Sequence, residues 1–121
     1  MRFRKNRGMN EYTPDKWQVV KIFGKDIPLT YKVFACWYGG YSGSDSWKMN
    51  SGIKSAKREE GYWLFEGFSG SVYKCHPDNY GSNMYGQGIL NGFIEQAKEK
   101  DVTIEKLPQD TDWLTLELDI S

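Results

Sequence analysis

The chain has 121 residues and a mass of 14.0 kDa, which fits one domain and leaves little room for a second hydrophobic core. Its mean hydropathy of −0.68, with 39% hydrophobic residues, is typical of a water-facing globular protein. Acidic and basic residues balance at 16 each, but four of the bases lie within residues 1–8, so the rest of the chain is mildly acidic. This distribution argues against a nucleic-acid-binding face, which needs clustered Lys or Arg on the folded surface.

The sequence shows no signal for secretion or membrane insertion. No apolar run approaches the roughly 18 residues that would span a bilayer, and no apolar stretch follows the charged amino terminus as in a signal peptide. The two cysteines, Cys36 and Cys75, are too few for a disulfide framework. We therefore expect a cytoplasmic protein without a membrane partner. Met9 resembles a natural start, so we expect residues 1–8 to be a basic, disordered tail and residues 9–121 to form a single domain.

Strand-forming residues dominate the first part of the domain. Residues 16–23 and 31–38 are rich in β-branched and aromatic side chains and are separated by Gly and Pro, which predicts an antiparallel pair. Residues 39–52 are rich in Gly and Ser and predict a long loop.

Three further strands are predicted in the middle of the chain, at residues 53–58, 62–68 and 71–75. Glu60 and Gly61 form a turn signal between the first two of them. Such closely spaced strands predict an antiparallel meander.

The hydrophobic pattern changes to a helical period over residues 87–100. Glycines at 86, 88 and 92 each disfavour a helix by about 1 kcal/mol relative to Ala, so the helix is expected either to begin late or to pack closely on the sheet. One face of this helix is apolar and consists of Ile89, Leu90, Phe93, Ile94 and Ala97.

The last part of the chain again favours strands. Residues 102–107 predict a strand that Pro108 ends. The alternation over residues 113–120 predicts a closing strand, although Asp112 could equally cap a short helix there. The expected fold is therefore α+β: one antiparallel sheet of about five to six strands, with one main helix packed on one face.

Two runs of the sequence resemble each other and suggest a binding site. Residues 37–44 and 64–71 both end in Gly, aromatic, Ser, Gly, Ser. Such a run places a ring beside backbone that exposes amide N–H groups, which suits an anion or a planar ligand. The alternative is that both are strand-end turns whose rings return to the core. The candidate ligand- or partner-binding residues are Tyr41, Ser42, Ser44, Asp45, Trp47, Phe68, Ser69, Ser71 and His76.

Cys75 and His76 are the one pair that suggests nucleophilic catalysis, and His76 is the only histidine. Adjacent residues on a strand point to opposite faces, so a Cys–His dyad is not expected there. We interpret them as a buried Cys75 followed by a His76 that caps the strand or bonds to the turn at Asp78. The glycine runs match neither a phosphate-binding loop nor a G-x-S-x-G motif. We expect no catalytic set, no metal site and no cofactor.

Several stretches resemble short uncharacterised open reading frames of tailed bacteriophages. They are Glu-Tyr-Thr-Pro-Asp-Lys-Trp at 11–17, the Trp-Tyr-Gly-Gly run at 37–47, Asn-Ser-Gly-Ile at 50–53 and Gly-Ser-Val-Tyr-Lys-Cys-His at 70–76. The resemblance covers most of residues 9–100. It implies a viral or prophage setting and brings no known activity with it.

The sequence favours a non-enzymatic binding module, accessory or host-modulating, whose aromatic, Gly and Ser loops contact a small ligand or a protein partner. One alternative is a small hydrolase or transferase with a site near Ser42 and Asp45 or near Cys75 and His76. Another is a homo-oligomeric structural subunit, in which the carboxyl-terminal strand would add to the sheet edge of a neighbour.

Overall fold

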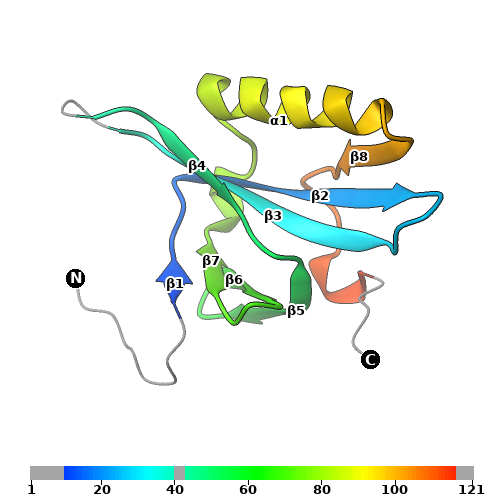
Figure 1. Cartoon of the computed structure of the whole chain (residues 1–121). Coiled ribbons are helices and arrows are strands. Elements are labelled where there is room, and N and C mark those ends of the chain that lie inside the picture. Colours follow the sequence, from blue (N-terminus) through cyan, green and yellow to red (C-terminus); the bar gives the residue numbers. More distant parts are fainter. Residues whose placement is uncertain (1–9, 40–42, 117–121) are drawn as a thin grey trace.

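Two four-stranded sheets and one long helix form three layers, as Figure 1 shows. The computed structural model describes residues 10–39 and 43–116. The helix covers one face of the first sheet, whose strand order is β4-β3-β2-β8, and the second sheet, β1-β7-β6-β5, covers the other face. The predicted α+β class is confirmed, but the prediction of one sheet of five to six strands is wrong.

The first sheet contains the predicted antiparallel pair, β2 (Lys16–Gly24) and β3 (Thr30–Trp37). The predicted strand at residues 102–107 is confirmed as β8 (Val102–Lys106), antiparallel to β2. The prediction of a loop throughout residues 39–52 is wrong in part, because β4 (Ser46–Met49) pairs with β3. Within this pairing, Trp47 of β4 is opposite Cys36 of β3, which belongs to the core on the helix-facing side of the sheet.

The second sheet contains the predicted meander of β5 (Ile53–Glu59), β6 (Tyr62–Gly67) and β7 (Val72–Cys75). The turn between β5 and β6 has positive φ at both Glu60 and Gly61, at 51° and 86°, which matches the twist of a tight hairpin. The fourth strand, β1 (Glu11–Tyr12), pairs in parallel with β7, so the sheet is not wholly antiparallel. A strand of two residues carries too little periodicity to be predicted.

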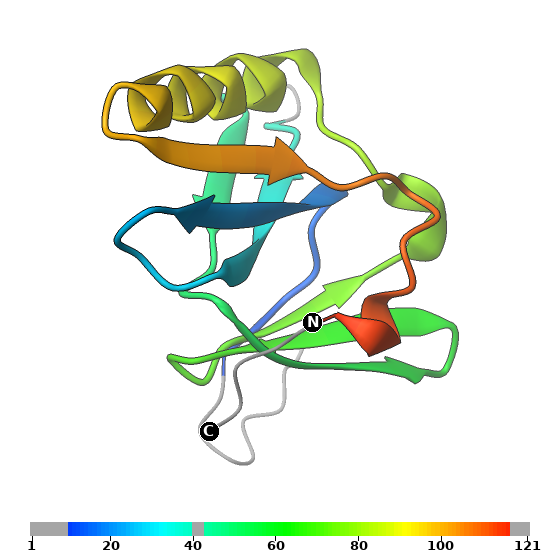
Figure 2. The same cartoon turned by 90° about the vertical axis from the view of Figure 1, so that its right-hand side faces the viewer.

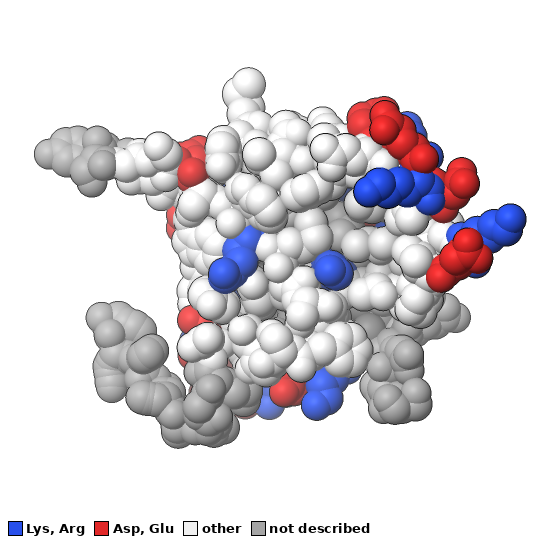
Figure 3. Space-filling view, viewed as in Figure 1, with Lys and Arg blue, Asp and Glu red and all other residues white. Residues whose placement is uncertain are grey.

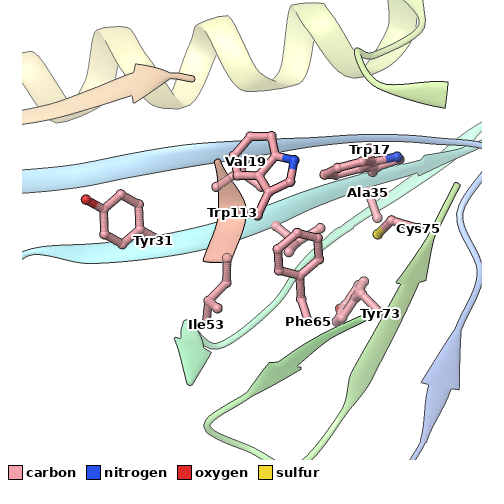
Figure 4. Packing of buried hydrophobic residues seen from close by; sticks show 10 residues of the cluster. Trp17, Val19, Tyr31, Ala35, Ile53, Phe65, Tyr73, Cys75 and Trp113 are labelled. Atoms are coloured by element: carbon pink, nitrogen blue, oxygen red, sulfur yellow. The ribbon is translucent and has the colours of Figure 1, made fainter. Parts of the chain in front are cut away.

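The main hydrophobic core lies between the two sheets and is rich in aromatic rings (Figure 4). Trp17 on β2 is its centre: its ring centroid lies 5.5 Å from that of Phe65 on β6 and 5.7 Å from that of Trp113. The indole N–H of Trp17 donates to the carbonyl oxygen of His76 at 2.7 Å, so this buried polar group is satisfied. The aromatic composition therefore serves mainly to fill the space between the sheets.

Asn50 is the residue at which the chain leaves the first sheet for the second. Its backbone N–H donates to Val33 O at 3.1 Å, and its side-chain Oδ1 accepts from Val33 N–H at 2.9 Å and from Gly52 N–H at 3.3 Å. The side chain thus takes the place of a strand carbonyl as the acceptor for Val33 N–H, while the Asn50 backbone still donates to Val33 O. Gly52 follows with a φ of +132°, a conformation that favours glycine, and the chain enters β5.

The helix α1 (Met84–Lys98) begins three residues before the predicted residues 87–100. Asn83 caps it, because its Oδ1 accepts from Gly86 N–H at 2.7 Å. Gly86 lies against Cys36 and Phe34 of β3, so close packing on the sheet is observed at this glycine, whereas a Cβ added at Gly88 or Gly92 would meet nothing within 4 Å. No helix within residues 10–39 and 43–116 combines the length and apolarity needed to cross a membrane.

The carboxyl-terminal part turns back toward the core between the sheets. The prediction of a closing strand over residues 113–120 is wrong at residues 113–115, which form the short 3-10 helix η4 (Trp113–Thr115). Residues 117–120 of that prediction lie outside the described part. Asp112 caps η4, with Oδ1 accepting from Leu114 N–H at 3.1 Å, as in the alternative interpretation. Figure 2 shows η4 beside the second sheet, where it buries Trp113. Burial of the Trp113 ring favours the 3-10 helix over a strand at this point of the chain.

Candidate binding site

The described part of the first aromatic Gly-Ser run, residues 37–39 and 43–44, forms the neck of the β3–β4 hairpin. Tyr41 and Ser42 lie outside the described residues, and Ser44 is exposed. Asp45 has a structural role: its Oδ1 accepts from Gly39 N–H at 2.9 Å, and its Oδ2 accepts from the side-chain amide of Asn83 at 3.3 Å. These bonds connect the hairpin neck to the residue that caps α1.

The second run closes the turn between β6 and β7. Phe68 is about half exposed, and its N–H donates to Gly52 O at 3.0 Å. Ser69 N–H donates to Ser51 Oγ at 2.9 Å, and the Ser71 carbonyl accepts from the backbone of β6. This turn is therefore attached to the link that follows Asn50.

The structure does not bring the described parts of the two runs together. The β3–β4 hairpin extends from the first sheet, whereas the β6–β7 turn belongs to the second (Figure 1). The described polar contacts of Asp45 are with Gly39 and Asn83, while those of Ser69 are with Ser51. The described polar contacts thus attach the two loops to different parts of the fold.

Cys75 and His76 are placed apart, as the alternation of a strand requires. Cys75 is buried in the core between the sheets, where burial raises the pKa of its thiol well above the ordinary value. His76 is partly exposed and caps the short 3-10 helix η3 (Pro77–Asn79), with Nδ1 accepting from Asp78 N–H at 3.1 Å. This is the turn-bonding role that we had expected for His76. A protonated, buried thiol without the imidazole beside it is poorly arranged for nucleophilic catalysis.

The second cysteine and the metal-ligating side chains provide no alternative reactive centre. Cys36 is buried on the helix-facing side of β3, and burial is the main cause that raises the pKa of its thiol. Within the part of the chain that the structure describes, no three His, Cys, Asp or Glu side chains are grouped to hold a metal ion.

An open groove of about 470 Å³ lies between α1 and the helix-facing side of the first sheet. It is lined from three directions. The lining residues are Trp47 and Met49 of β4, Phe93, Gln96 and Ala97 of α1, Lys100 just beyond α1, and Val102 and Ile104 of β8.

Trp47 is the predicted site residue that the structure places in this groove. Its ring is half-buried and stacks on Phe34 of β3, with centroids 5.7 Å apart, and meets Phe93 of α1 edge-on at 5.3 Å. It therefore connects the β4 edge of the sheet to the helix while leaving part of its surface open. The stacking holds the ring in a fixed orientation at the wall of the groove.

The groove arises because the helix does not cover the whole helix-facing side of the sheet. Figure 3 shows that the surface over α1, β3 and β4 is mostly uncharged apart from isolated basic side chains, and that acidic and basic side chains gather together toward the carboxyl-terminal end of the helix. Six of the eight lining residues are apolar, and Lys100 is the one that carries a charge. Sequence reasoning missed this site because its walls come from three segments that are far apart in the chain.

Comparison of the chain with protein-family models, with curated proteins and with solved structures gives no match.

Proposed function

We propose that the protein is a non-enzymatic binding module that holds a small, largely apolar molecule in the groove between α1 and the first sheet. The observation that carries this proposal is the groove itself: about 470 Å³ with an apolar lining and only two polar side chains. Ligand pockets for small molecules span about 300–1,000 Å³ and combine apolar walls with a few polar groups that fix orientation.

The composition of the lining favours binding over chemistry. The eight residues that line the groove include no carboxylate, imidazole, thiol or hydroxyl group. Of the residues named for the hydrolase or transferase alternative, Ser42 lies outside the described residues, Asp45 is bonded to Gly39 and Asn83, and Cys75 is buried between the sheets. The groove can therefore desolvate and orient a ligand, and apart from the amine of Lys100 its lining holds no nucleophile or general base.

The walls are suited to an apolar molecule. The lining includes the flexible thioether of Met49 and the aromatic rings of Phe93 and Trp47. Each methylene group that a ligand buries there contributes about 0.8 kcal/mol. Because the groove is open, part of the ligand stays in water, and we expect a dissociation constant on the order of 1 mM for a chain such as 1-octanol.

The test is a titration with 1-octanol followed by ¹H–¹⁵N NMR. We expect saturable shifts at the indole N–H of Trp47 and at the amides of Phe93 and Ala97, which line the groove. Shifts confined to Phe68 and Ser69 would instead favour the aromatic Gly-Ser loops as the contact surface, and absence of saturable shifts would refute a ligand groove.

A pair of variants places the same added side chain inside and outside the groove. Ala97→Leu fills the groove from the α1 wall and should weaken 1-octanol binding at least fivefold. Gln87→Leu introduces the same residue at an exposed position of α1 that does not line the groove, and should leave binding unchanged. Leu and Ala have similar helix propensities, so both variants are expected to fold.

A further inference from the structure

The two polar residues of the groove lie at neighbouring positions of the same segment. Gln96 is in the last turns of α1, and Lys100 follows four residues later, just after the helix ends. Residues four apart in a helical segment point to the same side. The polar groups are therefore gathered toward one end of the helix, and the remaining lining from β4, β8 and Phe93 is apolar.

The charge of Lys100 is not neutralised by a close acid. Among the residues that the structure describes, the ion pairs join Lys98 to Glu95 and His76 to Asp78. Glu99 and Asp101 are adjacent to Lys100 in the chain, yet neither carboxylate approaches its ammonium group closely enough to form an ion pair within that set. The one charged side chain of the groove is thus a cation that can accept an anionic partner.

A second lysine lies on the same side of the sheet. Lys32 is two residues from Phe34 on β3 and opposite Val20 on β2. Both Phe34 and Val20 belong to the helix-facing core, so the alternation of the strand places Lys32 on that face too. No acidic residue is among the side chains that line the groove. Lys100 therefore carries the one charge in the lining of the groove, while Lys32 lies on the same face of the sheet outside that lining.

We propose that the ligand of the groove is an anionic amphiphile, a free molecule with an apolar chain and one carboxylate-like end. Its chain would lie along Trp47, Met49 and Ile104, and its anionic end would lie at Lys100. This inference rests on the proposed function, since it adds the charge of the ligand to a groove already argued to bind apolar molecules.

The test compares octanoate with 1-octanol, which share a chain length and differ in the charge of the head group. Octanoate is ionised at neutral pH, as carboxylic acids are. We expect octanoate to bind about two- to fivefold more tightly than 1-octanol, the range of a solvent-exposed ion pair. The preference should shrink toward one as ionic strength rises from about 0.01 M to about 1 M, because the Debye length falls from about 30 Å to about 3 Å.

Two variants that each remove one positive charge show whether the preference for octanoate comes from contact with Lys100 or from the net charge of the region. Lys100→Gln should abolish the preference for octanoate, so that this variant binds octanoate and 1-octanol with equal affinity. Lys98→Gln removes the same charge two residues away, from a side chain that pairs with Glu95 and does not line the groove, and should keep the preference.

The outcomes distinguish this inference from the proposed function. Equal binding of octanoate and 1-octanol would overturn the anionic ligand and leave an apolar-ligand groove in place. Binding of neither probe would overturn both. Recruitment to anionic vesicles without octanoate binding would also overturn the inference, because the occupant would then be a membrane surface. A dimer in native mass spectrometry that blocks the groove would overturn it too, because the occupant would then be a second copy of the chain.

Discussion

The three glycines of α1 give the sharpest test of how the helix lies on the first sheet. In an exposed helix position, replacement of Gly by Ala stabilises a protein by up to about 1 kcal/mol. A Cβ added at Gly88 or Gly92 would meet nothing within 4 Å. A Cβ added at Gly86 would overlap with Cys36 Sγ and lie 3.0 Å from Asn83 Oδ1 and 3.3 Å from Phe34 Cε2.

The structure therefore predicts opposite signs for identical substitutions in one helix. Cys36 and Phe34 are both fully buried on β3, so the first turn of α1 would have to move away from the sheet. Overpacking of this kind costs about 1–3 kcal/mol, and disturbance of the Asn83 cap adds about 1 kcal/mol. After subtraction of the gain in helix propensity, Gly86→Ala should lower the free energy of unfolding by about 1–3 kcal/mol.

The assay is urea and thermal unfolding of the three single variants, followed by circular dichroism. Gly88→Ala and Gly92→Ala should each raise the unfolding midpoint, whereas Gly86→Ala should lower the melting temperature by about 4 °C or more per kcal/mol. Equal m values would show that the variants differ in stability and not in the extent of unfolding.

A second substitution tests the named contact. Cys36→Ala removes the sulfur atom that the new Cβ would overlap. In the double variant Gly86→Ala with Cys36→Ala, the loss should be smaller than the sum of the two single losses. A stabilising Gly86→Ala, or strict additivity with Cys36→Ala, would refute the close approach of the helix to β3.

Two further predictions concern buried polar groups. Asn50→Ala should lower the free energy of unfolding by about 2–4 kcal/mol in urea titrations, because the N–H groups of Val33 and Gly52 lose their acceptor; a change below 1 kcal/mol would contradict this role. Stability should fall between about pH 10 and pH 12, because burial raises the pKa of Tyr73 and of Tyr80 to about 12 and the unfolded phenols therefore ionise first; the raised pKa values of the Cys36 and Cys75 thiols add to the loss at alkaline pH in the same way. Phenolate absorbance recorded with circular dichroism checks this, and ionisation of both tyrosines near pH 10 in an intact fold would exclude it.

The sequence by itself determined the elements whose signals are local. The β2–β3 pair and the meander of β5, β6 and β7 follow from alternating side chains and from turn residues such as Glu60 and Gly61. The helix followed from its apolar stripe, although its start depended on the cap at Asn83. The turn-bonding role of His76 was also predictable, because it needs only neighbours two residues away.

Only the tertiary structure decided how these elements are distributed between layers. β2 and β3 are buried on both faces, so their pattern does not reveal that one face meets a helix and the other a second sheet. Strand β4 depends on pairing with β3, and the 3-10 turn at Trp113 depends on the space beside Trp17.

The groove is a feature of the tertiary structure for the same reason. Trp47, Phe93 and Ile104 come from three separate elements and meet only after the helix has packed on the sheet. The position of the helix is in turn set by the contact of Gly86 with Cys36, which no local pattern records. Periodicity reports which face of an element is apolar, whereas the packing of other elements decides how much of that face stays uncovered.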